Sequence, residues 1–204
     1  MLTIIIPVYN EIKTIEKILN KIDEIDFISK EIILVDDSST DGTKNLIKNK
    51  LSKKVKKVIY HEINQGKGSA IRSAQSFVNG DYVIIQDADL EYDPKDYYNL
   101  LKPIIERKYD VVYGSRVLNK KRYKLKNFTS IFRIFANHLL TIISNLINNQ
   151  NLTDAHTCYK MFQSKVFKKI NLREKGFAFC PEVTTKLSKK NYKIIEIPIS
   201  YRGR

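Results

Sequence analysis

The 204-residue chain has no tryptophan and few of the residues that mark fibrous, disordered or disulfide-built proteins: two cysteines, seven glycines and five prolines. Cys158 and Cys180 are too far apart in sequence for a metal knuckle, and one pair cannot make a disulfide scaffold. This usage is typical of a reducing compartment. Because 43% of the residues are hydrophobic, we expect a folded globular protein with a substantial core.

Several catalytic signatures are also absent. No Gly-x-Gly-x-x-Gly follows the first apolar run and no Gly-x-x-x-x-Gly-Lys-Ser/Thr occurs, which argues against dinucleotide-binding and P-loop proteins. The three histidines, His61, His138 and His156, lack the spacing of zinc ligands. A nucleophile elbow is missing too, so Ser-His-Asp hydrolysis is not supported.

Targeting and membrane-spanning segments are not predicted. The N-terminus has no basic region before its apolar run and no small-residue cleavage site. The longest stretch without formal charge, Ile134 to Thr153, is interrupted by asparagines, a glutamine and His138, so it is too polar for a spanning helix. We expect a cytoplasmic chain that does not cross a membrane.

Positive charge is in clear excess, with 36 Lys and Arg against 22 Asp and Glu, a net charge of +14. Such a field attracts phosphates, nucleic acid or an anionic membrane face. Runs such as Lys53-Lys54 and Lys56-Lys57 are more typical of solvated faces than of binding sites. A nucleic-acid-binding module is a distant alternative, because the interleaved aromatic and basic residues of an RNA-binding sheet are missing.

Short β-branched runs alternate with segments of helical period, which predicts an α/β protein with a mostly parallel sheet covered by helices. The predicted strands are Leu2 to Val8, Glu31 to Asp36, Lys57 to Glu62, Tyr82 to Asp87, Asp110 to Gly114 and Ile194 to Ile199. The predicted helices are Ile12 to Ile25, Thr43 to Leu51 after an Asp41 cap, Gly68 to Asn79 and Pro94 to Glu106. With no repeat or linker, residues 1–204 are expected to form one domain.

Acidic residues gather where three of the predicted strands end. The first is followed by Tyr9-Asn10-Glu11, the second by Asp36-Asp37-Ser38-Ser39-Thr40-Asp41, and the fourth by Asp87-Ala88-Asp89-Leu90-Glu91. Ligands of open parallel sheets lie at the carboxyl ends of the strands, so these clusters indicate one shared site.

Asp87 and Asp89 offer hard oxygen ligands in a short turn, which suits Mg²⁺ or Mn²⁺ held together with substrate phosphates. Taken alone, the two residues could equally cap the following turn. A nucleotide diphosphate entering a carboxylate-lined cleft would be repelled without a cation, and this favours the metal.

These clusters resemble the motifs of family 2 glycosyltransferases of the GT-A fold, in particular dolichyl- or polyprenyl-phosphate mannose synthases and their bacterial relatives. The resemblance covers nearly the whole chain. It is carried by Ile6-Pro7-Val8-Tyr9-Asn10-Glu11, Val35-Asp36-Asp37-Ser38-Ser39-Thr40-Asp41-Gly42-Thr43, Asn64-Gln65-Gly66-Lys67-Gly68, Gln86-Asp87-Ala88-Asp89-Leu90-Glu91, Gly114-Ser115-Arg116, Thr153-Asp154-x-x-Thr157-Cys158-Tyr159-Lys160 and Pro198-Ile199-Ser200-Tyr201-Arg202.

The resemblance implies roles for residues on the donor side. Residues implied to bind the donor nucleotide are Pro7, Tyr9, Glu11, Asp37, Asp87, Ala88, Asp89 and either Arg202 or Arg204. The implied metal ligands are Asp87, Asp89 and Glu91, with Asp89 also catalytic. Glu91 departs from the family pattern, because mannose synthases often carry Gln there.

On the acceptor side, Arg116 resembles the family arginine that meets the acceptor phosphate, and Arg133 is a second candidate. A planar guanidinium holds two phosphate oxygens and so aims the attack, whereas lysine is a point charge. The alternative interpretation of Arg116 is a surface ion pair.

The implied activity is inverting transfer of a hexose, most readily mannose, from a nucleotide-diphosphate sugar to a polyprenyl phosphate. GDP-mannose is the first expected donor and UDP-glucose the second. Residues 1–118 would bind the donor and residues 119–204 the acceptor. After a basic loop that begins at Asn119, the amphipathic segment 128–147 could lie on the cytoplasmic face of a membrane as a peripheral anchor, or pack as an ordinary helix.

Two other functions remain open at this point. A transferase with a soluble glycan or protein acceptor would use the same donor site. A sugar-nucleotide binder without activity is disfavoured, because the acidic clusters are intact.

Overall fold

The computed structural model describes residues 1–118 and 128–203, without the side chains of residues 128–135. Arg204 and the basic loop that begins at Asn119 therefore lie outside the described residues, as does the side chain of Arg133.

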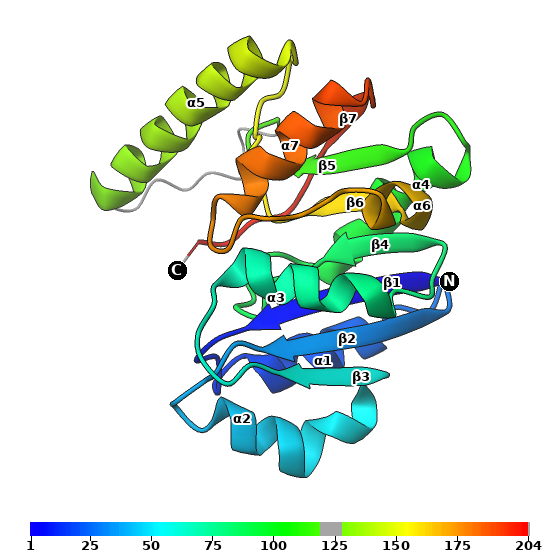
Figure 1. The fold of residues 1–204 in the computed structure, drawn as a ribbon, viewed down its shortest axis with the longest axis vertical. Helices are drawn as coiled ribbons and strands as arrows, with labels where there is room; N and C mark the ends of the chain where they lie inside the picture. Colours follow the sequence, from blue (N-terminus) through cyan, green and yellow to red (C-terminus); the bar gives the residue numbers. More distant parts are fainter. Residues whose placement is uncertain (119–127, 204) are drawn as a thin grey trace.

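Strands of the described residues form a single seven-stranded sheet in the order β3-β2-β1-β4-β6-β5-β7 (Figure 1). They are β1 (Leu2–Val8), β2 (Lys30–Asp36), β3 (Lys57–Tyr60), β4 (Tyr82–Ile85), β5 (Val111–Ser115), β6 (Lys160–Gln163) and β7 (Ile194–Pro198). All neighbours are parallel except β6, which runs antiparallel to both β4 and β5. The predicted mostly parallel sheet is confirmed.

All six predicted strands are present, and the sequence analysis missed β6. This strand is four residues long and its first three residues, Lys160, Met161 and Phe162, are buried. A buried lysine at its start removes both the apolar run and the alternating pattern by which a strand is recognised. Pairing of Val83 with Phe162 and of Val112 with Met161 inserts β6 between the two halves of the sheet.

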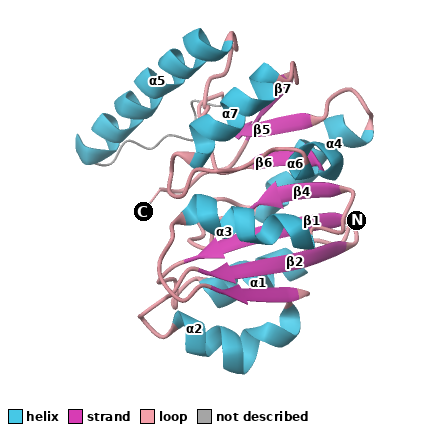
Figure 2. Cartoon of the chain, in the orientation of Figure 1, coloured by secondary structure: helices cyan, strands magenta, loops and turns pink. Residues whose placement is uncertain are grey.

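The helices follow the strands closely in sequence (Figure 2). They are α1 (Ile15–Asp23), α2 (Thr43–Leu46), α3 (Lys67–Ala74), α4 (Tyr97–Ile105), α5 (Phe128–Asn148), α6 (Ser164–Lys168) and α7 (Phe179–Lys189). A π-helical turn, Ile47–Leu51, extends α2, and 3-10 turns follow α3 and precede α4. The sequence analysis missed α6 and α7.

Burial of an aliphatic stripe explains why α1 forms where it does. Ile15, Ile18, Leu19 and Ile22 recur at three- and four-residue intervals and are all buried against the sheet. Figure 1 shows α3 and α7 on one face of the sheet and α1 on the other. The apolar core thus lies on both faces, and the ends of the strands remain accessible.

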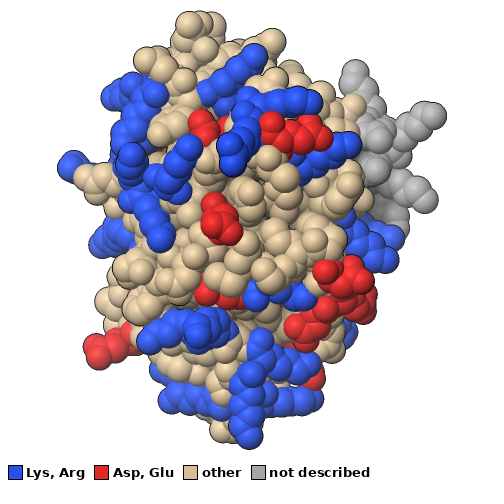
Figure 3. Space-filling model, turned by 90° about the vertical axis from the view of Figure 1, so that its right-hand side faces the viewer, with Lys and Arg blue, Asp and Glu red and all other residues tan. Residues whose placement is uncertain are grey.

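Lysine and arginine side chains are spread over the face of the molecule seen in Figure 3, with Asp and Glu side chains between them. The lysines of the two runs, Lys53, Lys54, Lys56 and Lys57, are exposed.

Candidate active site

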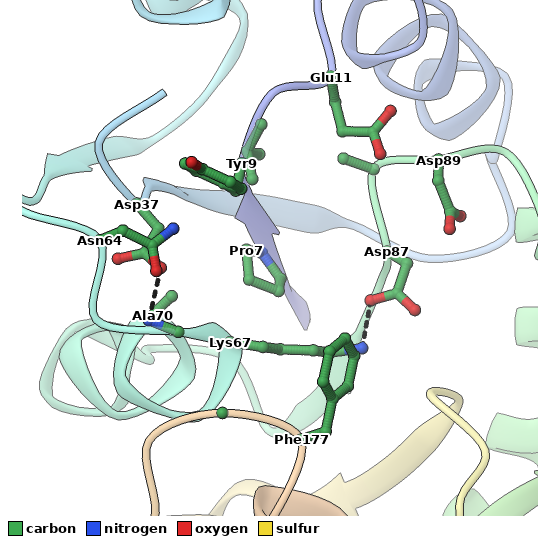
Figure 4. Close-up of a pocket in the computed structure, with 14 residues that line it drawn as sticks. Pro7, Tyr9, Glu11, Asp37, Asn64, Lys67, Ala70, Asp87, Asp89 and Phe177 are labelled. Carbon is green, nitrogen blue, oxygen red and sulfur yellow. Dashed lines mark hydrogen bonds and ion pairs between the residues drawn. The ribbon is translucent and has the colours of Figure 1, made fainter. Parts of the chain in front are cut away.

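A cavity of about 380 Å³ opens at the carboxyl ends of β1, β2 and β4 (Figure 4). It brings together the predicted donor-side residues of the described chain other than Glu91 and Arg202: Pro7, Tyr9, Glu11, Asp37, Asp87, Ala88 and Asp89. Val8, Asn64, Gly66, Lys67, Ala70, Gly176 and Phe177 complete the lining. The three acidic clusters therefore form one site, as the strand-end argument predicts.

Each of these three strands is followed by a non-glycine residue with left-handed backbone: Asn10 (φ 56°), Ser38 (φ 63°) and Leu90 (φ 67°). Asn and Ser tolerate this region through local hydrogen bonds, whereas for Leu it is strained, and such strain gathers at functional sites. Hydrogen bonds join the first two loops, from the Asn10 amide to Ser39 Oγ (3.0 Å) and from the Glu11 amide to Thr43 Oγ1 (3.0 Å).

Asp37 is fixed by three groups at one end of the cavity. Its carboxylate accepts hydrogen bonds from the amides of Gln65 (2.9 Å) and Gly66 (2.7 Å), and its Oδ1 lies 2.6 Å from His61 Nδ1. The other ring nitrogen of His61 lies 2.9 Å from Ser73 Oγ. The buried His61 therefore orients Asp37, a role that the sequence analysis did not assign to it.

Lys67, the first residue of α3, extends across the cavity to Asp87 (Figure 4). Its Nζ forms an ion pair with Asp87 Oδ1 and lies 3.3 Å from Cys158 Sγ. Burial would lower the pKa of Lys67, but the carboxylate of Asp87 outweighs it and raises that pKa well above its usual value. Lys67 is therefore an ammonium at neutral pH.

The three predicted metal ligands do not converge in this structure. Asp87 and Asp89 line the cavity, whereas Glu91 Oε2 accepts a hydrogen bond from the Tyr201 hydroxyl (2.7 Å). Burial and the Glu91 carboxylate both raise the pKa of Tyr201, so it stays a donor. Among the described residues, no three His, Cys, Asp or Glu side chains are arranged to hold a metal ion by themselves.

Arg202, predicted to contact the donor diphosphate, is exposed and does not appear among the cavity residues. Its amide donates to the Glu91 carbonyl (2.9 Å), and Tyr201 pairs with Tyr92 in an isolated antiparallel bridge. The backbone of this C-terminal segment is thus attached to the Asp89–Glu91 loop.

Arg116 directly follows β5, and the carboxylate of Asp154 accepts hydrogen bonds from three of its N–H groups. Its Nε and Nη2 reach the two carboxylate oxygens at 2.7 and 2.8 Å, and its amide donates at 3.0 Å. Burial would raise the pKa of Asp154, but the Arg116 hydrogen bonds and charge lower it. Glu196 accepts from the amides of Thr153 (2.6 Å) and Asp154 (2.8 Å) and so holds the same loop.

The structure thus places the fork of Arg116 on a carboxylate of its own chain. A contact of this fork with an acceptor phosphate stays a prediction, and the ion pair is not the surface pair of the alternative interpretation. The pair is buried, with the Arg116 side chain 11% exposed and that of Asp154 3%.

A loop before α7 closes one side of the cavity and was not predicted to do so. Gly68 has no room for a side chain, because a Cβ there would lie 2.4 Å from the carbonyl oxygens of both Glu174 and Lys175. This close approach brings Gly176 and Phe177 to the cavity, and Phe177 is 83% exposed. The glycine at position 68 was a visible signal, but the partner of its close approach was not.

The charges of the cavity decide which ligands it can take. Among the described residues that line it, four are carboxylates, Glu11, Asp37, Asp87 and Asp89, and one is a cation, Lys67. A diphosphate would be repelled by such a lining unless a further cation entered with it. Two hard carboxylates beside open space fit Mg²⁺ or Mn²⁺, which take one or two carboxylates and fill their shells with phosphate and water oxygens.

The sequence profile described as Glycosyl transferase family 2 matches residues 3–171. The chain therefore belongs to the family 2 glycosyltransferases.

Two relatives resemble the chain along almost its entire length. The UDP-N-acetylglucosamine--dolichyl-phosphate N-acetylglucosaminyltransferase of Methanococcus voltae is 29% identical, covering 98% of this chain and 84% of the relative. The dolichol-phosphate mannosyltransferase of Pyrococcus furiosus is 26% identical, covering 98% of this chain and 56% of the relative.

Among solved structures, the chain resembles glucosyl-3-phosphoglycerate synthase from Mycobacterium tuberculosis, which was crystallised with Mn²⁺, UDP and phosphoglyceric acid. The TM-score is 0.74 at 17% identity, covering 100% of this chain and 71% of that one. The predicted GT-A-type α/β fold is confirmed. The chain is a glycosyltransferase, and the mycobacterial synthase structure contains Mn²⁺ and UDP.

Proposed function

We propose that the chain transfers a hexose from a nucleotide-diphosphate sugar to a polyprenyl phosphate. The observation that carries the donor half is the cavity at three strand ends, with its four carboxylates and one ammonium. The names of the relatives from Methanococcus voltae and Pyrococcus furiosus support a dolichyl-type phosphate acceptor. The names of those two relatives give different sugars, so they do not decide which donor this chain uses. We keep GDP-mannose as the first donor to test and UDP-glucose as the second.

Asp87 and Asp89 are the residues we propose to hold Mg²⁺ or Mn²⁺ beside the donor diphosphate. The cation, when bound, neutralises the charge that develops on the leaving nucleotide diphosphate. The acceptor phosphate is already a nucleophile near neutral pH, so the chain needs no strong general base. Its task is to hold two anions close together and in line.

Positioning of the acceptor is the part we propose for residues 119–204, with residues 1–118 binding the donor. Arg116 acts there by fixing the Thr153–Asp154 loop, and a direct contact with the acceptor phosphate stays a prediction. Arg133 is kept as a second candidate for that contact.

Arg116→Lys should lower turnover about a hundredfold while donor affinity changes little, because misplacement by about 1 Å has an effect of that order. Lysine keeps the charge but cannot span both oxygens of Asp154 or of a phosphate. Steady-state kinetics with polyprenyl phosphate varied at saturating donor measures this. The exposed Arg107→Lys serves as the control, and a variant with wild-type rate but weaker donor binding would place Arg116 on the donor side.

In the described part of helix α5, polar side chains are buried and apolar ones are exposed, the reverse of the usual arrangement of a helix in water. Its described part buries the polar side chains of Thr141, Ser144 and Asn148 against the rest of the protein. Apart from His138, its exposed side chains are aliphatic: Leu139, Leu140, Ile142, Ile143, Leu146 and Ile147. A contiguous exposed apolar face of this kind indicates a surface that contacts another apolar surface.

We propose that this face of α5 lies in the headgroup region of a membrane, where a polyprenyl phosphate is met. Figure 1 shows α5 at the edge of the molecule, packed on α7. The contact we propose is peripheral. No helix of the described residues is long and apolar enough to cross a bilayer.

Replacing Leu146 and Ile147 together by Ser should weaken binding to anionic liposomes about tenfold or more without lowering the free energy of unfolding. These two side chains are 79% and 73% exposed, so only their transfer into lipid is lost. Sedimentation with vesicles measures binding, and Ile105→Ser, an exposed residue of α4, is the control. Unchanged vesicle binding combined with loss of a dimer would assign the face to a second copy of the chain.

The donor is identified by thermal denaturation with GDP, UDP and their sugars, each with and without Mn²⁺. A ligand that binds only the folded chain raises the melting temperature, by linkage. The proposal expects one nucleotide to do so strongly only with Mn²⁺. Absence of any shift with every nucleotide would contradict it.

A further inference from the structure

Lys67 has no role in the function described so far, although it is the single cation among the described cavity residues. Its ammonium is bound to Asp87, one of the two carboxylates proposed to hold the divalent cation. The pair is sheltered, with the Lys67 side chain 17% exposed and that of Asp87 21%. Lys67 therefore occupies an oxygen of Asp87 that the proposed divalent cation would need.

We propose that Lys67 is an exchangeable counter-cation: it neutralises Asp87 while the cavity is empty, and moves to the donor's diphosphate when a divalent cation takes Asp87. The inference rests on the proposed function and adds to it that the divalent cation binds tightly only together with the diphosphate. A divalent cation alone binds weakly, because it must displace an ammonium. A divalent cation that arrives with a diphosphate binds tightly, because the phosphate oxygens receive that ammonium.

Three properties of the site support the exchange. Lysine is a compact charge on a flexible four-carbon stem, so its Nζ can move between partners while its backbone stays at the start of α3. An ammonium and a divalent cation on one carboxylate repel each other, and this repulsion is large in a sheltered site. The lining has no second cation among the described residues to meet the diphosphate in its place.

Linkage makes the consequence measurable. If the nucleotide strengthens cation binding, the cation strengthens nucleotide binding by the same factor. Removing the ammonium should therefore tighten binding of Mn²⁺ alone, weaken binding of the nucleotide, and shrink the coupling between the two.

The test is calorimetric titration of Mn²⁺ into wild type and Lys67→Met, first alone and then with saturating GDP or UDP, whichever binds. We expect Mn²⁺ alone to bind the variant about tenfold or more tightly than wild type, equivalent to about 1.4 kcal/mol. The effect of nucleotide on Mn²⁺ affinity should fall by a similar factor. Mn²⁺ alone should also raise the melting temperature of the variant more than that of wild type.

Lys17→Met removes an exposed positive charge elsewhere and should leave all these quantities unchanged. Lys67→Gln repeats the test with a polar side chain if Lys67→Met does not fold. Equal or weaker binding of Mn²⁺ alone by the Lys67 variants would overturn the inference. If wild type itself shows no coupling between Mn²⁺ and any nucleotide, the proposed function fails instead.

Discussion

Asp89→Ala should abolish cation-dependent donor binding and lower turnover by about a thousandfold or more, while the fold stays intact. Asp89 lines the cavity on the loop after β4, so its loss removes a cation ligand and opens no hole in the core. Losing one electrostatic group at the reacting centre commonly has an effect of this order. Calorimetric titration of the nucleotide sugar with Mn²⁺ and single-turnover kinetics measure the two losses.

Asp89→Asn sharpens the experiment, because its amide oxygen can still accept the hydrogen bond that Asp89 Oδ1 receives from the Glu91 amide (3.1 Å). A loss seen in both variants is then a loss of charge and not of loop shape. Asp93→Asn is the matched control, since Asp93 caps the turn before α4. Unchanged donor affinity in both Asp89 variants would refute the assignment of this carboxylate to the cation.

Asp154→Ala should lower the free energy of unfolding by about 3–5 kcal/mol, because removing one partner of a buried ion pair leaves the other charge uncompensated. The Arg116 guanidinium would lose both carboxylate oxygens, while Thr153 of the same loop keeps its hydrogen bond to Ser115 of β5. Urea denaturation measures the change. The double variant Arg116→Met with Asp154→Ala should recover part of the loss.

Asp110→Ala provides the comparison, because Asp110 forms a surface ion pair with Lys165 at 3.6 Å and should lose less than about 1 kcal/mol. The Asp154 contribution also depends on pH. The pKa of Asp154 is lower in the folded than in the unfolded state. Its contribution to the free energy of unfolding is therefore fully present above about pH 3.8 and is lost as the pH falls through the folded-state pKa. A loss in Asp154→Ala no larger than in Asp110→Ala would show that the buried pair does not hold the loop.

The sequence was sufficient for the parts of the fold that rest on periodic patterns. Strands such as Leu2–Val8 and the stripe of Ile15, Ile18, Leu19 and Ile22 bury local, regular sets of side chains. The same patterns could not indicate β6, because the buried Lys160 at its start interrupts the apolar run of a strand only four residues long. Nor do they reveal α7, whose place depends on the sheet and on α5.

In the site, too, the residues that gather could be predicted from the sequence, whereas their partners could not. Strand-end position was enough to gather Glu11, Asp37, Asp87 and Asp89, because parallel strands end at one edge. Which groups those carboxylates meet could not be predicted from sequence, since partners such as His61 for Asp37 or Lys67 for Asp87 come from other loops. The pairing of Arg116 with Asp154, 38 residues away, likewise could not be read from the sequence.

The exposed aliphatic face of α5 bears on a question that the amphipathic pattern of the sequence left open. The sequence allowed either a membrane-surface helix or an ordinary packed helix. Burial of Thr141, Ser144 and Asn148, with Leu146 and Ile147 outside, favours the first.

The central claim is that this glycosyltransferase passes its sugar to a polyprenyl phosphate. The most direct measurement is extraction of the product into organic solvent after incubation with labelled GDP-mannose, UDP-glucose or UDP-N-acetylglucosamine, Mn²⁺ and polyprenyl phosphate. We predict that label from one donor enters the organic phase, and that this requires both the lipid and the cation. Label that stays in the aqueous phase with every donor, while donor is consumed in the presence of a soluble glycan or protein acceptor, would contradict it.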